Sequence, residues 1–217
     1  MHPSVSRGKQ LLTEGYGIDS SDLPPFEQGP LDPRHWFTRP DRRLEIEIGS
    51  GKGTFLVQQA PLRPQVNYLG IERSLAYYRY AANRMRRRRL SNVMILRADA
   101  AQFIRFWCAD DVASVIHLYF SDPWPKKRHH KRRLIQDSSL RELHRVLQSR
   151  GELRLVTDHE ELWRWYEGHA QRHAQWFDRR PFERPESAGA DEIVGTNFER
   201  KYRREARPFY AMTLQKK

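Results

Sequence analysis

The 217-residue chain carries 39 lysines and arginines against 27 aspartates and glutamates, a formal net charge of +12. This excess favours a polyanionic partner, although a basic protein without such a partner also fits the charge alone. Hydrophobic residues make up 38% of the chain, including 6 Trp, 9 Tyr and 10 Phe, so there is enough apolar material for a core and wholesale disorder is excluded.

The single cysteine, Cys108, excludes an internal disulfide and a cysteine-rich zinc site, and we assign no metal ligands from the sequence. The first residues lack the apolar core of a signal peptide, and no segment reaches the length of a membrane span. We therefore expect a cytoplasmic protein without a membrane partner.

Residues 1–33 mix Gly, Pro, Ser and charged residues without periodicity, and their prolines recur too often for a long helix. We predict a flexible basic arm over residues 1–33 and one domain over residues 34–217.

The rest of the chain alternates predicted strands with predicted helices. The strands are expected at residues 44–48, 66–71, 93–96, 113–120, 152–156 and 208–214. Leucines at helical spacing predict a helix over residues 140–147 that stops at Gly151, and residues 178–195 are expected to form a loop. Strands that alternate with helices predict an α/β fold, with a parallel sheet covered by helices on both faces.

The first of these strands leads into a glycine-rich turn. Its glycines lie at alternate positions, Gly49, Gly51 and Gly53. A strand, a glycine turn and a helix let the backbone approach a bound nucleotide closely. The P-loop pattern fails because Lys52 lies among the glycines, and the dinucleotide pattern fails because Thr54 takes the third glycine position. Glu47 would meet any ligand there with a carboxylate, so a pyrophosphate is not expected.

Acidic residues fall at or just after four predicted strand ends: Glu47, Glu72, Asp99 and Asp122. Ligands of open α/β sheets bind beyond the carboxyl ends of the strands, and a cationic sulfonium cofactor with an amino-acid tail suits these acids. Glu72 is placed to bind ribose hydroxyls and Asp99 to meet an adenine edge. Taken singly, Glu72 could be a surface residue and Asp99 a helix cap.

Asp122 begins a run, Asp-Pro-Trp-Pro, that places a carboxylate beside a rigid aromatic ring. In nucleic-acid methyltransferases such a ring can stack on an extruded base while the carboxylate accepts hydrogen bonds from the base edge. Basic and histidine residues then crowd positions 126–133. A solvated surface or an import signal would also explain this run. Its place beside Asp122, where a methyl group would be transferred, favours a role in binding RNA or DNA.

Six segments together resemble the bacterial tRNA (guanine-N7)-methyltransferases: residues 45–53, 70–72, 98–99, 119–129, 157–158 and 196–199. The glycine motif is shared by methyltransferases generally, whereas Asp-Pro-Trp-Pro-Lys-Lys-Arg-His and Thr-Asn-Phe-Glu are specific. The resemblance implies a Rossmann-like class I fold with a mostly parallel seven-stranded sheet, as a monomer or homodimer. It also implies methyl transfer from S-adenosylmethionine to N7 of a guanosine in the tRNA variable loop.

The resemblance assigns roles by position. It implies cofactor contacts by Glu47, Gly49, Gly51, Gly53, Glu72, Asp99 and Asp122, with Asp122 also the catalytic residue. It implies substrate contacts by Lys126, Asp158, Thr196, Asn197, Phe198 and Glu199. It implies RNA contacts by Arg128, His129, His130, Lys131, Arg132 and Arg133. The stretch 73–78 departs from the family pattern beside the expected ribose site.

Two of these assignments have structural alternatives. Asp158 with Glu161 would also fit a helix N-cap and its partner, and Thr196 with Glu199 forms a capping box.

Two other functions of the protein remain open as well. One is a noncatalytic RNA-binding partner subunit with a methyltransferase fold, against which the intact acids argue. The other is an amino-directed nucleic-acid methyltransferase.

Overall fold

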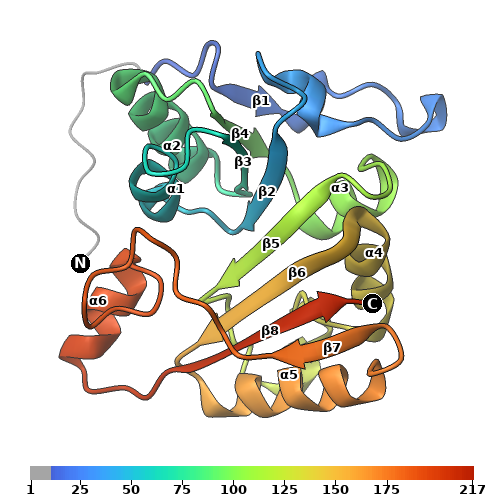
Figure 1. The fold of residues 1–217 in the computed structure, drawn as a ribbon, viewed down its shortest axis with the longest axis vertical. Coiled ribbons are helices and arrows are strands. Elements are labelled where there is room, and N and C mark those ends of the chain that lie inside the picture. Colours follow the sequence, from blue (N-terminus) through green and yellow to red (C-terminus); the bar gives the residue numbers. More distant parts are fainter. Residues whose placement is uncertain (1–10) are drawn as a thin grey trace.

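The computed structural model describes residues 11–217, which form a sheet in the strand order β1-β4-β3-β2-β5-β6-β8-β7 (Figure 1). The strands are β1 Gly17–Asp19, β2 Arg43–Ile48, β3 Val66–Ile71, β4 Val93–Arg97, β5 Ala113–Tyr119, β6 Leu147–Thr157, β7 Phe177–Arg180 and β8 Tyr210–Lys216. The pairs from β1 to β6 are parallel, and β8 lies antiparallel to both β6 and β7. The predicted α/β class with a mostly parallel sheet is confirmed.

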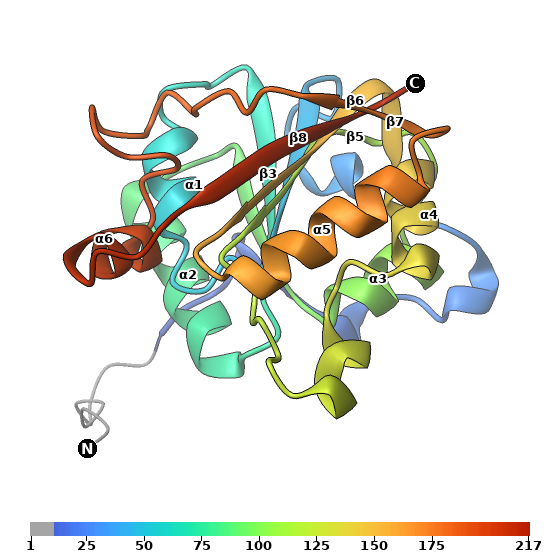
Figure 2. The same cartoon turned by 90° about the horizontal axis from the view of Figure 1, so that it is seen from below.

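Helices cover both faces of this sheet (Figures 1 and 2). They are α1 Thr54–Gln59, α2 Leu75–Arg88, α3 Ala100–Phe106, α4 Asp137–Val146, α5 Glu160–Arg172 and α6 Asn197–Arg204, with short 3-10 turns at Ser20–Asp22, Phe26–Gln28, Pro33–Trp36 and Lys127–Arg132. Apolar residues of α1 and α2 pack into one core cluster, and those of α3, α4 and α5 into another. None of the helices in the described part of the chain has the length and apolar content to cross a bilayer.

The two core clusters follow from the alternation of side chains along the strands. In β3, Tyr68 packs with the α1–α2 cluster, whereas its neighbour Leu69 packs with the α3–α5 cluster. β2 pairs with β3 on one side and with β5 on the other, so the strand order reverses at β2. In doubly wound sheets this reversal opens a crevice at the carboxyl ends of the strands.

The sheet has eight strands rather than the predicted seven. The additional strand β1 lies in the segment predicted to be a flexible arm, of which residues 1–10 fall outside the described part. β1 pairs in parallel with β4, and Leu31 forms a further bridge to Cys108. The description of this arm as basic is also wrong, since residues 1–33 contain two basic side chains against five acidic ones.

The region around Gly151 also differs from the sequence prediction. Helix α4 ends at Val146, and β6 begins at once, so Gly151 lies inside a strand. The β5–β6 register jumps from Ala113–Leu147 to Val115–Glu152. A Cβ on Gly151 would lie 2.8 Å from Gln148 O, so the glycine is needed for a bulge and not for a helix stop.

Candidate active site

The glycine loop turns the chain sharply at the end of β2. Gly49, Gly51 and Gly53 have φ values of 76°, 54° and 65°, in the left-handed region that favours glycine. A Cβ on Gly53 would in addition lie 2.5 Å from Met85 Cε on α2. The Gly49 amide donates to Ile71 O at 2.8 Å, which holds the loop against the end of β3.

A cavity of about 700 Å³ opens at the carboxyl ends of β2, β3, β4 and β5. This volume is typical of sites for nucleoside-sized ligands. Its lining includes five predicted cofactor-binding residues: Gly49, Gly51, Glu72, Asp99 and Asp122. A second cavity, of about 260 Å³, is lined by Glu47 and by the start of α6. Gly49, Gly51, Tyr77, Tyr119 and Phe198 line both cavities, so the two are parts of one cleft.

Two of the acids in this cleft already make hydrogen bonds within the protein. Glu72 accepts from the Gly51 amide at 2.8 Å and from the Ser74 amide at 2.7 Å. Asp99 is the N-cap of α3, where it accepts from the Gln102 amide at 3.2 Å. The capping alternative for Asp99 is therefore correct, and it coexists with a place in the cavity wall.

Glu47 differs from both. Its side chain is buried, and its Oε2 atom finds no hydrogen-bond partner among residues 11–217. The pKa of Glu47 is raised to about 8, mainly because the side chain is buried and to a smaller extent because the Glu72 carboxylate lies nearby. A buried carboxylate without a partner is costly, and a positively charged group in the second cavity would supply the missing one.

The Asp122 loop leaves β5 through an unusual backbone. Phe120 and Trp124 both have positive φ, at 53° and 44°, which is uncommon for bulky residues and marks local strain. Asp122 and Trp124 both line the larger cavity. The Arg132 guanidinium lies over the Trp124 ring at 4.9 Å. The His129 ring packs edge-on against the same Trp124 ring at 5.8 Å.

Arg133 stabilises this strained loop through contacts inside the protein. Its Nε donates to Pro123 O at 2.9 Å, and its Nη2 pairs with Glu161 at 2.7 Å. Its guanidinium also lies over the Trp165 ring at 4.9 Å, and only 1% of its side chain is exposed. The expectation that Arg133 contacts RNA is therefore wrong, because the side chain is committed inside the protein.

The remaining residues of the basic segment lie at the surface. Lys127–Arg132 forms a 3-10 turn after Lys126. The exposed side chains here are Lys126, Lys127, Arg128, Lys131 and Arg132. His130 is partly buried, with its Nε2 3.1 Å from a carboxylate oxygen of Glu161. Exposed positive charge thus follows the Asp122 loop in the chain, and Arg132 also lines the larger cavity.

The start of α6 lines the smaller cavity. Thr196 caps α6 by accepting from the Glu199 amide at 3.1 Å, which is one half of the predicted capping box. The other half is not formed, because the Glu199 side chain accepts from the amides of residues 193–195 instead. Asn197 donates to Thr54 Oγ1 at 2.9 Å and ties this segment to α1. The Phe198 side chain is exposed and lines both cavities.

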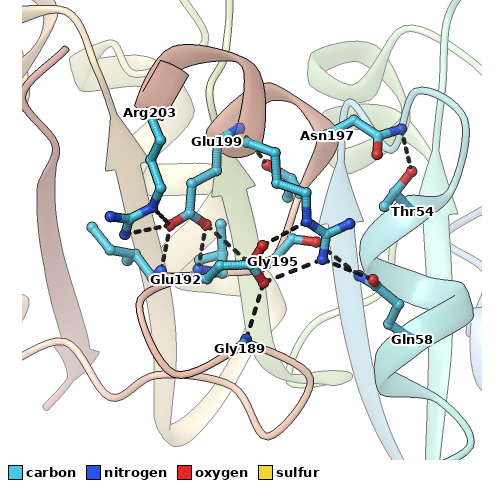
Figure 3. Close-up of polar contacts among 12 residues, drawn as sticks. Thr54, Gln58, Gly189, Glu192, Gly195, Asn197, Glu199 and Arg203 are labelled. Atoms are coloured by element: carbon cyan, nitrogen blue, oxygen red, sulfur yellow. Dashed lines mark hydrogen bonds and ion pairs between the residues drawn. The ribbon is translucent and has the colours of Figure 1, made fainter. Parts of the chain in front are cut away.

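Glu199 is the fully buried centre of that segment (Figure 3). Its Oε2 accepts from the amides of Val194 and Gly195, each at 2.9 Å. Its Oε1 accepts from the Ile193 amide and pairs with Arg203 at 2.8 Å. The carboxylate therefore organises the chain before α6 and offers no exposed oxygen to a substrate.

Asp158 is not the helix cap that its spacing suggested. The N-cap of α5 is His159, whose ring accepts from the Leu162 amide, and Asp158 instead pairs with Arg207 at 2.7 Å. Only 11% of the Asp158 side chain is exposed. Its position after β6 ties the start of β8 to the same end of the sheet.

Comparison with known proteins identifies the family. The model of a family described as "putative methyltransferase" matches residues 41–212. The chain belongs to this methyltransferase family. Two solved structures share the fold at low identity. An aminoglycoside resistance methyltransferase, NpmB1, has a TM-score of 0.58 at 16% identity and covers 81% of this chain and 88% of its own. A 30S ribosomal A1408 methyltransferase from an uncultured bacterium has a TM-score of 0.57 at 12% identity, with the same coverage.

Relatives of higher identity carry a narrower name, tRNA (guanine-N(7)-)-methyltransferase. The protein from Streptococcus mutans is 38% identical over 58% of this methyltransferase and 59% of its own length. Those from Geobacillus thermodenitrificans and Alkalilimnicola ehrlichii are 40% and 39% identical, over 58% and 70% of this chain and 57% and 62% of their own. The matches thus span less than two thirds of each relative.

Sequence reasoning missed a buried polar chain behind the cleft of this methyltransferase. Tyr119, which lines both cavities, places its hydroxyl 2.6 Å from His117 Nδ1, and His117 Nε2 lies 2.9 Å from Glu45. The Phe55 ring packs against both rings. Polar residues at alternate positions in otherwise apolar strands were the available indication, because such residues share one buried face.

The methyltransferase brings most, not all, of the predicted contact residues into its cleft. In the described chain, those outside both cavities include Gly53, Lys126, Asp158 and Glu199. Three residues of the atypical stretch 73–78, Arg73, Ser74 and Tyr77, also line the larger cavity. Arg73 lies 3.7 Å from Asp99, so this stretch adds a positive charge to the cavity rim.

Proposed function

We propose that this chain is an S-adenosylmethionine-dependent tRNA (guanine-N7)-methyltransferase that forms 7-methylguanosine in the tRNA variable loop. The observation that carries the proposal is the Asp122 loop, which places a carboxylate and the Trp124 ring in the wall of the larger cavity. The name shared by the relatives from three bacteria supports the same substrate.

The acids of the cleft suit the proposed cofactor. S-adenosylmethionine supplies an electrophilic methyl group on a positively charged sulfur. The unpaired Glu47 carboxylate fits its positively charged amino-acid end. Glu72 and Asp99 would hold the nucleoside part, Glu72 as acceptor for ribose hydroxyls and Asp99 for an amino group of the adenine. Glu72 can accept from such a donor and keep its Gly51 contact, since one carboxylate oxygen accepts more than one hydrogen bond.

The chemistry asks little of the protein beyond alignment and charge stabilisation. Guanine N7 has a lone pair and no proton, so its attack on the methyl group needs no general base, and the site has to orient the base. Asp122 would accept hydrogen bonds from the N–H groups of the guanine edge and stabilise the positive charge that grows on the ring. The Trp124 ring offers a surface on which an extruded base can stack.

The exposed basic residues would bind the tRNA backbone. Arg128, Lys131 and Arg132 lie on the turn that follows the Asp122 loop, where phosphates flanking an extruded base would pass. Such contacts release counterions and make binding dependent on salt. A cytoplasmic enzyme with tRNA as its partner is part of this proposal.

The proposal is tested by incubating the full-length protein with unmodified tRNA and S-adenosylmethionine labelled in the methyl group. Nucleoside analysis should recover the label as 7-methylguanosine, and primer-extension or cleavage mapping should place it in the variable loop. Label on an exocyclic amino group would instead identify an amino-directed methyltransferase. Cofactor and tRNA binding without transfer would identify a noncatalytic partner subunit.

A further inference from the structure

Three side chains that can bind a metal meet between helices α4 and α5, outside the cleft. Asp137 is the first residue of α4, His169 lies in the last turn of α5, and His173 is the C-cap that follows α5. Asp137 Oδ1 lies 2.8 Å from His169 Nδ1 and 2.9 Å from His173 Nε2. Among residues 11–217, this is a set of His and Asp side chains whose ligand atoms all lie within 4.8 Å of one another.

The scaffold holds both imidazole rings in place. Positions 169 and 173 are one helical turn apart and therefore project from the same face. The His173 ring stacks on Trp176 at 4.7 Å with an interplanar angle of 12°, and the His169 ring packs against Trp165 at 4.8 Å. Trp165 in turn donates to Ile135 O at 2.7 Å, just before α4. Ligands that are fixed in this way lose little conformational freedom when a metal binds.

The polar contacts in this cluster conflict with one another. Arg172 Nη2 lies 2.8 Å from His169 Nδ1 and 3.2 Å from Asp137 Oδ1. A guanidinium only donates, so His169 Nδ1 would have to accept from Arg172 and donate to Asp137 with the same atom. A neutral imidazole nitrogen does one or the other. A metal cation in place of the guanidinium removes the conflict, because His169 Nδ1 and Asp137 Oδ1 then both act as ligands.

We propose that Asp137 Oδ1, His169 Nδ1 and His173 Nε2 form a site for a divalent transition metal of the zinc class, with Arg172 displaced into solvent. Half of the Arg172 side chain is already exposed, at 53%, so it can leave without disturbing the core. Zinc bonds to imidazole nitrogen and carboxylate oxygen of about 2.0–2.2 Å require ligand atoms about 3.3 Å apart in a tetrahedron. The two contacts of Asp137 Oδ1 need to open by only about half an ångström, the two histidine nitrogens lie within 4.8 Å of one another, and a water molecule completes the fourth position.

This site has a structural consequence for the neighbouring basic turn. The Gln136 side chain, immediately before Asp137, donates to His130 O at 2.8 Å and to Arg133 O at 3.2 Å. A metal that fixes Asp137 against α5 therefore also fixes the base of the turn at Lys127–Arg132. The ligand set favours zinc, nickel or cobalt over magnesium or calcium, which prefer oxygen ligands only.

The test uses full-length protein without a histidine tag, freed of metal with a chelator. Titration with Co²⁺ should give the visible absorption of a tetrahedral site that saturates at one equivalent, and one equivalent of Zn²⁺ should abolish it. Zn²⁺ should raise the midpoint of thermal unfolding. Arg172→Ala should bind Co²⁺ more tightly than the wild type, since it removes the competing positive charge.

Variants separate this site from other histidines. Asp137→Asn and His173→Gln should each weaken Co²⁺ binding at least tenfold, whereas His129→Gln, in the basic turn, should not. Each variant is melted with chelator and with Zn²⁺, so a loss of stability from the substitution alone cancels in the comparison. No Co²⁺ uptake by either the wild type or Arg172→Ala would overturn the proposal, as would equal uptake by Asp137→Asn.

Discussion

Two buried glutamates differ in how their charge is balanced: Glu47 lines the cleft, and Glu199 lies outside it at the start of α6. Glu199 is fully buried and both of its oxygens are engaged, by three backbone amides and by Arg203. Glu47 is buried too, yet its Oε2 finds no partner in the described residues 11–217. Because an unpaired buried charge costs several kcal/mol, Glu47 holds a proton up to a pKa of about 8, and a cationic ligand beside it would favour the charged form. The fully paired Glu199 instead belongs to the scaffold.

The arginines after the Asp122 loop show the same contrast. Arg133 is buried and fastens the loop, whereas Arg128 and Arg132 are exposed beside it. Arginines within one basic run therefore have two roles: the buried one stabilises the Asp122 loop, and the exposed ones add charge to the surface. Residue type and position alone would have given all of them the same role.

The largest expected effect lies at Asp122, the acid exposed to the proposed substrate. Asp122→Asn keeps the shape of the side chain and removes its charge, so it should lower the rate of methyl transfer by about 10²–10³-fold. Cofactor affinity should stay near the wild-type value, because Glu47, Glu72 and Asp99 are untouched. Single-turnover transfer and calorimetric cofactor binding measure the two quantities. Wild-type turnover by this variant would remove Asp122 from the chemistry.

Glu47→Gln tests the unpaired side of the comparison. A buried carboxylate opposite a cationic ligand contributes about 2–5 kcal/mol, so the variant should bind S-adenosylmethionine about a hundredfold more weakly. Binding to wild-type protein at pH 7 should also release a proton, because the pKa of Glu47 is about 8 before a cation pairs with it. Calorimetry in buffers of different ionisation enthalpy detects this release, which the variant should lack. Equal proton release by both proteins would contradict this assignment.

The same substitution should change how stability depends on pH. The pKa of Glu47 is about 8 in the folded protein against an ordinary value of 4.5, so between these pH values the folded state holds the extra proton. The contribution of Glu47 to the free energy of unfolding is therefore complete below about pH 4.5 and is lost as pH rises toward 8. Thermal melts of the ligand-free protein should show a smaller decline over this range for Glu47→Gln.

Glu199→Gln tests the paired side. Glutamine cannot accept at both ends, so at least one amide of the 193–195 turn loses its partner, together with the ion pair to Arg203. The free energy of unfolding should fall by about 2–3 kcal/mol, as measured by urea denaturation. Glu205→Gln, at an exposed position on the same segment, is the matched control and should change stability by less than about 0.5 kcal/mol. An unchanged free energy of unfolding for Glu199→Gln would show that this carboxylate does not stabilise the segment before α6.

Much of this architecture could be predicted from local sequence because the dominant elements are long and regular. The strand predicted at residues 66–71 coincides with β3, and the acids at strand ends gather because parallel strands end at one edge of the sheet. The three-residue β1 and the charged β7 escaped prediction, since neither has an apolar alternation of its own. β1 and β7 become strands because they pair with β4 and β8.

The roles of individual charged residues were the least predictable part. Burial of Arg133 depends on Glu161 and Trp165, which lie about thirty residues further along the chain and on another element. The cap that Thr196 provides could be predicted from spacing. The three preceding amides that Glu199 binds could not, because that contact depends on how the segment before α6 folds. Such contacts exist only after the fold has formed.

The smallest expected effect separates the two kinds of arginine in the basic run. Arg128→Glu combined with Arg132→Glu should weaken tRNA binding and reduce the slope of log affinity against log salt by about one for each phosphate that the variant no longer binds. Arg133→Lys keeps the charge but not the forked hydrogen bonds to Pro123 O and Glu161, so the salt slope should stay unchanged while kcat falls about tenfold. Filter binding of tRNA at several salt concentrations, with steady-state kinetics beside it, measures both. A changed slope for Arg133→Lys would show that the buried arginine binds phosphate after all.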